Sequence, residues 1–366
     1  LAIVFSYKLL HKRAFLLFYG EVCMKKLLLA TAIAGLSVSA QAAPTVYGKV
    51  FLTVDAGNVE TTYNSAIKQV SEDSNESGLN SNGSRIGLKG SEALTANTDV
   101  LYQLEYGVKV DDNSSNFTSR DTYLGVANKQ YGTLLAGRLT TIDDNVDFAS
   151  VLKGNNVADI GPSFNAPRAN NAFAYVSPNY NGAQFLAMYG LDSDNDKNSI
   201  DNEDQFGVAA TYSTGPINAG ASYITHGDDH HVRVSGNYAV SPMLTVGALY
   251  QISEFGVAAK NQKASPFGVV GDKKENTLMV SGEMKTVTPW TAYGQVTLID
   301  NVAGIDGRES FGLGVGGKYA FTQAATGHLY TGYVKSDRKN VVYNGAVYDT
   351  QKDSGFGIGG GLEYKF

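Results

Sequence analysis

The amino-acid sequence predicts an all-β fold, a sixteen-stranded antiparallel β-barrel that crosses a membrane. Three observations lead to this prediction. Segments of about ten residues alternate between apolar and polar side chains, which is the period of a β-strand with two different faces. The connections between these segments alternate between short turns and long polar loops, as they do in transmembrane barrels. After Ala43 no run of about eighteen apolar residues occurs, so the sequence offers no candidate for a membrane-spanning helix.

The first 42 residues have the features of an export leader. Met24 and two lysines are followed by a short apolar run and by the small-residue pattern Ala40-Gln41-Ala42, which is typical of a signal-peptide cleavage site. We therefore expect a signal peptide over residues 24–42 and a mature chain over 43–366. We expect residues 1–23 to be an upstream extension from a start site assigned too early; an unusually long N-terminal region of the leader is the alternative.

The strands follow from the alternation of side chains along the mature chain. In the segment 99–109, Tyr102 and Leu104 share one face, whereas Gln103 and Glu105 share the other. The same pattern recurs to the last residue, and it predicts that one face contacts lipid and the other contacts water. The predicted strands are 45–55, 84–92, 99–109, 118–127, 132–139, 170–178, 183–191, 205–213, 217–226, 230–240, 243–253, 277–287, 290–299, 310–321, 327–336 and 354–366.

The connections between these segments favour a barrel over other all-β folds. Short turns occur at 179–182, 214–216, 241–242, 288–289 and 323–325. Long polar connections are expected at 56–83, 140–169, 192–204, 254–276 and 337–353. Short turns on the periplasmic side and long loops on the extracellular side are typical of an up-and-down membrane barrel. A soluble β-sandwich is the alternative, but it rarely has so many long hairpins of uniform length.

The charge and the cysteine content exclude several classes of protein. The chain has a formal net charge of −6, and residues 1–42 hold five Lys or Arg and one Glu, so the mature chain carries −10. We therefore expect no nucleic acid as a partner, because phosphate neutralisation needs clustered cations. The single cysteine, Cys23, lies before the mature chain, so no disulfide and no cysteine metal site is possible there. An acidic, exported, cysteine-free chain fits the envelope of a Gram-negative cell.

Several short motifs follow one another along the mature chain. They are Val46-Tyr47-Gly48-Lys49-Val50, Ser84-Arg85-Ile86-Gly87-Leu88-Lys89-Gly90, Ser119-Arg120-Asp121-Thr122-Tyr123-Leu124-Gly125, Tyr131-Gly132-Thr133-Leu134-Leu135-Ala136-Gly137-Arg138 and the terminal Leu362-Glu363-Tyr364-Lys365-Phe366. In these motifs the chain resembles the general porin family of Gram-negative bacteria, and the Vibrio-type trimeric porins within it. The resemblance implies a sixteen-stranded barrel, a homotrimer in the outer membrane and a third loop folded inward to narrow the pore.

The resemblance also implies partners. Phe366 matches the terminal aromatic residue that the barrel-assembly machinery recognises in this family. Outer-membrane lipids and lipopolysaccharide would surround the barrel, and small hydrophilic solutes and ions would pass through it by diffusion, without a cofactor, a metal or catalysis.

The predicted inward loop is the segment 140–169, and its composition supports that role independently. A fully solvated loop would not need its apolar residues, such as Val146, Phe148 and Leu152, whereas a loop that packs on an inner wall would. We predict an acidic side of the constriction at Asp143, Asp144, Asp147 and Asp159. By resemblance, the basic wall opposite it consists of Lys49, Arg85, Arg120, Arg138 and Arg168. The alternative role for the arginines is to hold the loop by binding its carbonyl oxygens.

The charges in the pore would set its ion preference. The four aspartates of the loop and the net charge of −10 favour cations, so we expect mild cation selectivity. One departure weakens the acidic side. The loop tip of the family usually reads Pro-Glu-Phe-Gly with two carboxylates, whereas this chain reads Ala158-Asp159-Ile160-Gly161.

Other motifs in the chain have simpler explanations. The GxGxxG match at 312–317 lies inside an alternating segment rather than between a strand and a helix, so we interpret its glycines as lumen-facing strand residues. The acidic segment 192–203 lacks the glycine of an EF-hand, and a solvated loop is the favoured interpretation over loose divalent-cation binding near lipopolysaccharide. His226, His230 and His231 have no zinc-site spacing, so we expect surface positions for them.

Three functions remain open at this point. The first is a diffusion channel, which the charged inner faces and the loop 140–169 favour. The second is an adhesin or phage-receptor barrel whose long loops are the functional part. The third is a barrel hydrolase, although no Gly-x-Ser-x-Gly motif is present.

Overall fold

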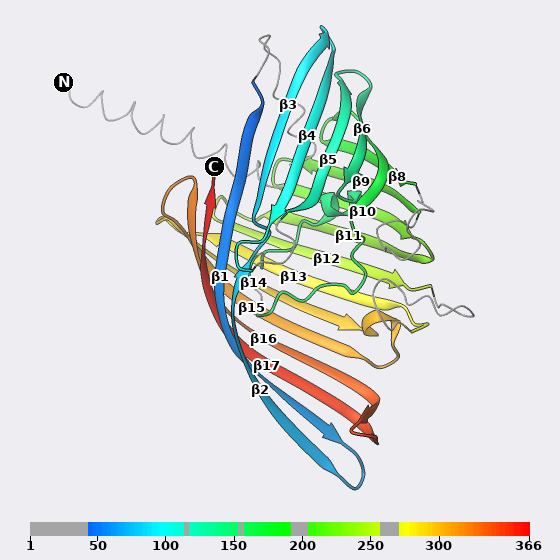
Figure 1. Ribbon diagram of the computed structural model, residues 1–366, viewed down its shortest axis with the longest axis vertical. Helices are drawn as coiled ribbons and strands as arrows, with labels where there is room; N and C mark the ends of the chain where they lie inside the picture. Colours follow the sequence, from blue (N-terminus) through cyan, green and yellow to red (C-terminus); the bar gives the residue numbers. More distant parts are fainter. Residues whose placement is uncertain (1–42, 113–116, 153, 155–156, 192–203, 257–270) are drawn as a thin grey trace, which may run out of the picture. The chain divides into compact units, whose positions relative to one another are not determined.

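The computed structural model describes residues 43–112, 117–152, 154, 157–191, 204–256 and 271–366. The predicted signal peptide, the predicted upstream extension and the acidic segment 192–203 lie outside the described residues. Among the described residues no helix is long and apolar enough to cross a membrane. The described part is all-β, with two short 3-10 helices, and Figure 1 shows its strands in chain order.

The strands have the following bounds: β1 Thr45–Asn64, β2 Gln69–Ser81, β3 Arg85–Thr95, β4 Thr98–Val108, β5 Phe117–Asn128, β6 Gly132–Leu139, β7 Ala169–Val176, β8 Ala183–Gly190, β9 Gln205–Thr214, β10 Ile217–His226, β11 Asp229–Ala239, β12 Leu244–Glu254, β13 Glu275–Lys285, β14 Trp290–Asp300, β15 Glu309–Ala320, β16 Ala325–Tyr343 and β17 Ala346–Lys365. The 3-10 helices are η1, Ile142–Val146, and η3, Val302–Gly304.

The strands close into a ring of sixteen positions. From β3 to β17 each strand pairs antiparallel with the next one in the chain, and β17 pairs with β1. The lower part of β1, residues 45–49, pairs with β3, while its upper part, residues 52–64, pairs with β2. Strands β2 and β3 therefore share one position of the ring. The predicted sixteen-stranded barrel is confirmed.

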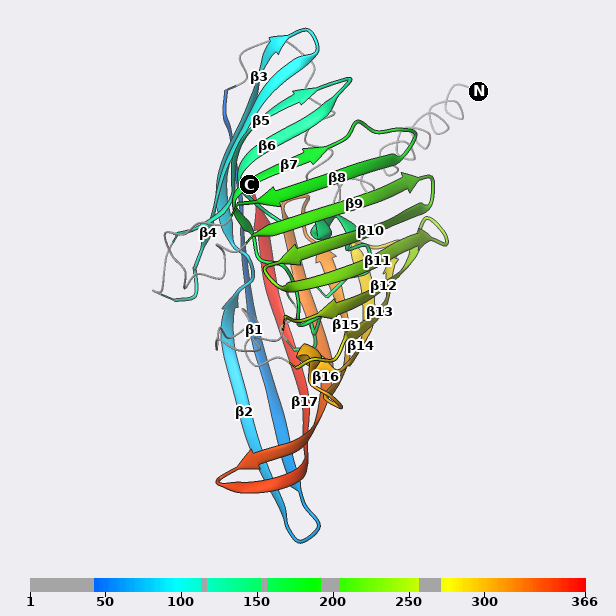
Figure 2. The same cartoon turned by 90° about the vertical axis from the view of Figure 1, so that its right-hand side faces the viewer.

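Two predicted loops are wrong, because both segments form hairpins. Residues 56–83 contain the upper part of β1 and the whole of β2, and residues 337–353 contain the ends of β16 and β17. Together β16, β17, β1 and β2 extend the wall past the other strands, as Figures 1 and 2 show. We define this extension as the tall wall. Both sides of β2 meet water, so its sequence lacks the apolar alternation on which the prediction depended.

The alternation of the remaining strands sorts the side chains between two environments. On β14, Leu298 is 45% exposed on the outer face, and its neighbour Thr297 is 1% exposed on the inner face. Val280 and Val315 continue the apolar outer face on the two adjacent strands. An exposed apolar surface of this kind is expected of a barrel wall in a membrane, where the surface contacts lipid and not water.

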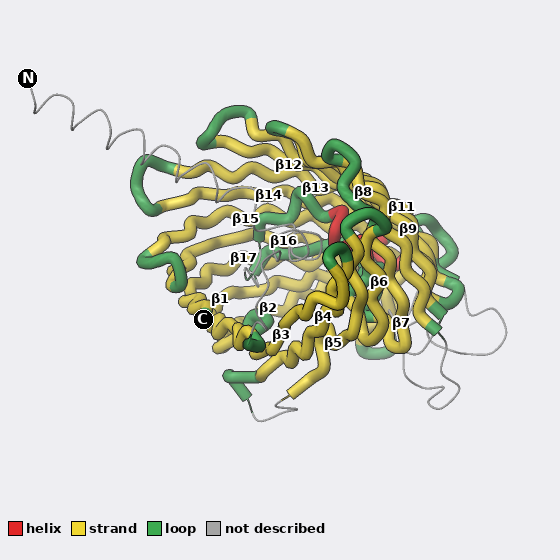
Figure 3. Tube along the Cα trace, turned by 90° about the horizontal axis from the view of Figure 1, so that it is seen from above, coloured by secondary structure: helices red, strands yellow, loops and turns green. Residues whose placement is uncertain are grey.

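The loop between β6 and β7 lies inside the ring. Figure 3 draws its 3-10 helix η1 within the circle of strands. Lumen-facing glycines give the loop room, because a Cβ atom there would meet loop atoms at short range: Gly207 meets Ile142, Gly220 and Gly247 meet Phe148, Gly312 meets Ile160, Gly332 meets Ala158 and Gly357 meets Val157. The glycines of the GxGxxG match thus belong to strand β15, as predicted, and Gly312 accommodates the loop.

Candidate functional site

The inner loop, which we define as residues 140–168, is held to the wall by apolar contacts and by hydrogen bonds. Ile142, Val146, Leu152 and Phe164 are almost fully buried although they belong to a loop. Three wall side chains bind its backbone: Ser235 accepts from Phe148 N at 3.0 Å, Gln295 accepts from Val151 N at 3.0 Å, and Gln251 donates to Phe164 O at 2.8 Å. The loop is therefore a fixed part of the lumen.

Asp143 anchors the loop and does not face water, contrary to the prediction. Its side chain is fully buried and lies 3.4 Å from both Arg233 and His231 on β11. Arg233 also donates to the Asp143 carbonyl oxygen at 3.1 Å. Burial alone would raise the pKa of Asp143, but the neighbouring His231 and the Arg233 charge lower it to about 2. Asp143 is an ion-pair partner of the wall, so it leaves the predicted acidic side.

The other three predicted aspartates lie at or near the surface of the loop. Asp144 and Asp159 are exposed, and Asp147 is half-buried. The Asp147 carboxylate accepts hydrogen bonds from the backbone of Ala149 and Ser150, at 3.3 and 2.9 Å. Asp147 thus shapes the turn that follows η1 and still carries a charge.

Two β-bulges shape the wall at the base of the loop. On β5, Arg120 and Asp121 together oppose the single residue Glu105 of β4. On β7, Asn170 and Asn171 together oppose Arg138 of β6. A bulge adds a residue on one strand and redirects side chains. The first bulge places a cation and an anion next to each other on the inner face.

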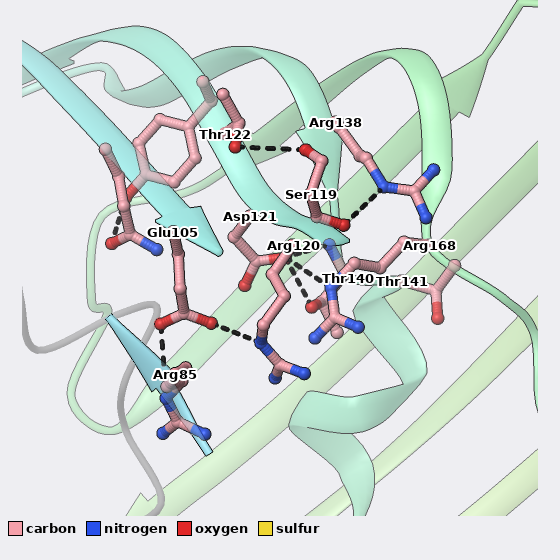
Figure 4. A network of polar contacts seen from close by, with 12 residues as sticks. Arg85, Glu105, Ser119, Arg120, Asp121, Thr122, Arg138, Thr140, Thr141 and Arg168 are labelled. Atoms are coloured by element: carbon pink, nitrogen blue, oxygen red, sulfur yellow. Dashed lines mark hydrogen bonds and ion pairs between the residues drawn. The ribbon is translucent and has the colours of Figure 1, made fainter. Parts of the chain in front are cut away.

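Glu105 links two of the predicted arginines. Its carboxylate lies 2.6 Å from Arg120 Nε and 3.3 Å from Arg85 Nε, and it accepts a hydrogen bond from the Tyr47 hydroxyl at 3.0 Å. The Glu105 side chain is 8% exposed, whereas each arginine keeps about a quarter of its side chain exposed. Figure 4 shows the two guanidinium groups on either side of this carboxylate.

Asp121 is the carboxylate that pairs with Arg168. Its Oδ1 lies 3.0 Å from Arg168 Nε and accepts hydrogen bonds from the backbone and hydroxyl of Thr140, at 2.8 and 2.7 Å. Both ends of the inner loop are therefore tied to one carboxylate of β5. Sequence reasoning missed Glu105 and Asp121 as members of the site, although Asp121 stands within the motif that supplied Arg120 and Glu105 lies in the predicted strand 99–109.

Lys49 lies in the same lumen but pairs with a different strand. Its Nζ is 3.5 Å from Glu363 on β17, a carboxylate that Lys365 also contacts at 3.2 Å. The structure therefore places Lys49, Arg85, Arg120 and Arg168 on inner faces, each beside a carboxylate.

Arg138 lies on the other face of the sheet, contrary to the prediction. It pairs with Thr122 in the same register that pairs Ala136 with Leu124, which is 60% exposed on the outer face. Paired residues in antiparallel strands share a face. Arg138 donates to the Ser119 carbonyl oxygen at 3.1 Å and to the Asn170 side chain. In Figure 4 it is drawn apart from the Arg85–Glu105–Arg120 group.

The histidine prediction is also wrong for two of its three residues. His226 and His231 are fully buried, because η1 covers this part of the wall, and only His230 is partly exposed, 3.7 Å from Glu254. The sequence shows the histidines beside long loops but not that the inner loop covers them.

Phe366 closes the last strand onto the first. Its backbone N–H donates to Gly48 O at 3.1 Å, and Gly48 N–H donates to Phe366 O at 2.9 Å. The ring lies over Gly48, where a Cβ atom would be 2.6 Å from the ring. This geometry explains a glycine at position 48, while recognition of Phe366 during assembly stays a prediction.

Comparison with known proteins shows to which family a chain with this architecture is similar. A family model described as Gram-negative porin matches residues 29–341. The major outer membrane protein P.IB of Neisseria meningitidis serogroup B / serotype 15 is 27% identical over 352 residues, which cover 88% of this chain and 98% of that protein. The alignments with P.IB of Neisseria sicca and with an outer membrane porin protein of Bordetella pertussis span only 47% and 59% of those proteins.

Solved structures share the fold at low sequence identity. An anion-selective porin from Comamonas acidovorans has a TM-score of 0.63 at 20% identity, over 88% of this chain and 99% of that chain. OmpT of Vibrio cholerae, in a trimer form, has a TM-score of 0.61 at 16% identity, over 89% of this chain and 100% of that chain.

Proposed function

We propose that this chain, which belongs to the Gram-negative porin family, is an outer-membrane channel for passive diffusion rather than an enzyme, and that the channel prefers cations mildly. The observation that carries the proposal is the inner loop, which faces a wall of paired charges across the lumen. Small hydrophilic solutes and ions pass between the two, and the width of the gap limits their size.

The balance of charge supports the cation preference. The wall residues described above are five cations, Lys49, Lys365, Arg85, Arg120 and Arg168, and three carboxylates, Glu105, Asp121 and Glu363. The loop adds Asp144, Asp147 and Asp159, and β1 adds Asp55, which accepts hydrogen bonds from the neutral Thr53 and Asn80. These seven carboxylates exceed the five cations by two, but Lys89 on the inner face of β3 and Lys153 in the sequence of the loop offset that excess. The net charge of −10 of the mature chain then favours cations, so the expected selectivity is weak.

We infer a homotrimer for the same channel, and the outer face near Arg138 supports it. A guanidinium group on the lipid face of a barrel costs up to about 2 to 4 kcal/mol, and the cost decreases from the midplane toward the interfaces. On this outer face Arg138 is paired with Thr122 of β5 and is hydrogen-bonded to Ser119, so its neighbours are polar. A second subunit covering this face would remove that cost. Contact with lipopolysaccharide and recognition of Phe366 by the barrel-assembly machinery remain proposals of the same kind.

Reversal potentials across a tenfold KCl gradient in a planar bilayer test the selectivity. We expect a mild cation preference for the wild type, a weaker one for the double variant Asp144→Asn, Asp159→Asn, and a stronger one for Arg120→Gln. Lys335→Gln, on the outer face of β16, is the matched control. A wild-type channel that clearly prefers anions, or aspartate variants without effect, would contradict the proposed roles.

A further inference from the structure

The inner face of the tall wall carries a row of charged and polar side chains above the constriction. Glu309 pairs with Asp337 at the start of β15, so the residues on either side of that pair, Arg308 and Arg338, come to adjacent strands on one face. Arg338 pairs in turn with Gln351 of β17. Gly312, four residues from Arg308, and Gly332, six residues from Arg338, face the inner loop, which identifies this face as the lumen side.

The next row toward the membrane is neutral or acidic, and its side chains are already bonded. Ser310 and Ser336 lie 3.1 Å apart, and Asp353 accepts hydrogen bonds from Thr61 at 2.9 Å and from Gln351 at 2.8 Å. Asp353 is therefore the carboxylate nearest to the two arginines in sequence register. Its hydrogen bonds come from neutral groups, and it balances only one of the two guanidinium charges.

The two arginines have unused donors. The Nε atoms of Arg308 and Arg338 are buried, and among the residues that the structure describes neither has a hydrogen-bond acceptor. A buried donor without an acceptor costs about 1 to 3 kcal/mol. Burial, followed by the positive charge of Arg338, lowers the pKa of Arg308. The fold thus holds two like charges together and leaves part of their hydrogen-bonding capacity unused.

A third cation, Lys339, lies nearby on the other face of β16. The Lys339 side chain reaches over Gly307, where a Cβ atom would be 2.7 Å from Lys339 Nζ. Gly307 has a φ of 64° in the turn that leads into Arg308. Lys339 follows Arg338 directly in the strand and therefore points away from the lumen, as Lys335 does. The lumen face carries Arg308 and Arg338, and the carboxylates that act on Arg308 are Asp353 and Glu275. Glu275 already accepts hydrogen bonds from the backbone of Ser163 and Ala303.

We propose that Arg308 and Arg338 form a binding site for an oxyanion of the phosphate type, carried by a small solute that enters from the loop side. A tetrahedral oxyanion offers several acceptor oxygens, and guanidinium groups bind such oxygens in pairs. The site lies outside the constriction and goes beyond the selectivity proposed above. It concentrates anionic solutes at the entrance of a channel whose narrowest part favours cations.

Single-channel recording with inorganic phosphate tests the site. Phosphate added on the loop side should produce brief interruptions of the KCl current, and equal concentrations of neutral glucose should not. The double variant Arg308→Gln, Arg338→Gln should raise the phosphate concentration needed for half-maximal interruption about tenfold or more, which corresponds to the loss of one charge-assisted contact. Arg338→Lys keeps the charge without the planar fork and should lie in between. Lys335→Gln, on the opposite face of the same strand, should match the wild type.

Three results would overturn the proposal: wild-type current that phosphate does not interrupt, interruptions that persist unchanged in the double variant, or interruptions that disappear in Arg85→Gln, Arg120→Gln instead. A second measurement covers the case in which the double variant does not fold. Broadening of the phosphate ³¹P resonance by the wild-type trimer in detergent should be reversed by sulfate, and its absence would equally refute the site.

Discussion

Replacing Asp143 by Asn should release the inner loop from the wall without unfolding the barrel. The Asp143 carboxylate faces Arg233 and His231 at 3.4 Å and is fully buried. Its pKa is lowered from 3.8 to about 2, which corresponds to about 2 to 3 kcal/mol of attachment at neutral pH. The variant also leaves Arg233 buried without its counter-charge, and breaking a buried pair in this way costs about 3 to 5 kcal/mol.

The pH dependence follows from the direction of the pKa shift. The attached loop holds Asp143 at the lower pKa, so the ion pair contributes fully above the ordinary pKa near 4. The contribution is lost as the pH falls through the lowered value near 2. Wild-type channels should therefore be quiet at pH 7 and noisy near pH 2 to 3, whereas the Asp143→Asn variant should be noisy at pH 7.

Single-channel recording measures this directly, as conductance and as noise in the open state. Asp144→Asn is the matched control, because it removes the same charge from the neighbouring exposed residue. The double variant Asp143→Asn, Arg233→Gln should be quieter than Asp143→Asn, since no uncompensated buried charge remains. Identical noise in Asp143→Asn, Asp144→Asn and the wild type at pH 7 would refute the anchoring role.

Three further predictions concern the barrel. Gly332→Ala should shift the loop tip and change the conductance, at an overpacking cost of about 1 to 3 kcal/mol, whereas the outward Gly294→Ala should not; equal conductance would contradict the seat at Gly332. Phe366→Ala and Gly48→Val should each lower the amount of folded barrel in outer membranes, because both disturb the closing pair; normal amounts would speak against it. Arg138→Glu should weaken the trimer on unheated detergent gels, and unchanged mobility would show that no subunit covers Arg138.

Strand positions could be predicted wherever one side of the wall meets lipid. The alternation fails in β2, whose residues 71–77 are polar on both sides because the tall wall stands in water on both faces. It also fails at the side of β6 on which Arg138 lies. Leu134 and Leu135 are both apolar, although the first is exposed on the outer face and the second is buried on the inner face, so the sequence does not show which face is inward.

The site was predictable in its residue types and less so in its pairing. Four of the five predicted cations do lie on inner faces, because the motifs that contain them are strand motifs. The difference between Asp143 and Asp144 depends on how η1 meets β11, and the role of Asp121 depends on a bulge. Both features depend on tertiary packing. Asp143 and Asp144 are identical neighbours in the sequence, so the sequence alone does not show which of them is buried.

The tall wall ends at an edge that could attract other strands. Among the described residues β2 pairs only with β1, so a row of peptide groups along its thirteen residues stays open toward water. Exposed edges of this length are templates for aggregation unless charge protects them. Glu72, Asp73 and Glu76 are exposed along β2, and two such edges meeting would bring carboxylates face to face. Crowded copies of the protein in one membrane are thereby kept from joining their sheets into a continuous ribbon.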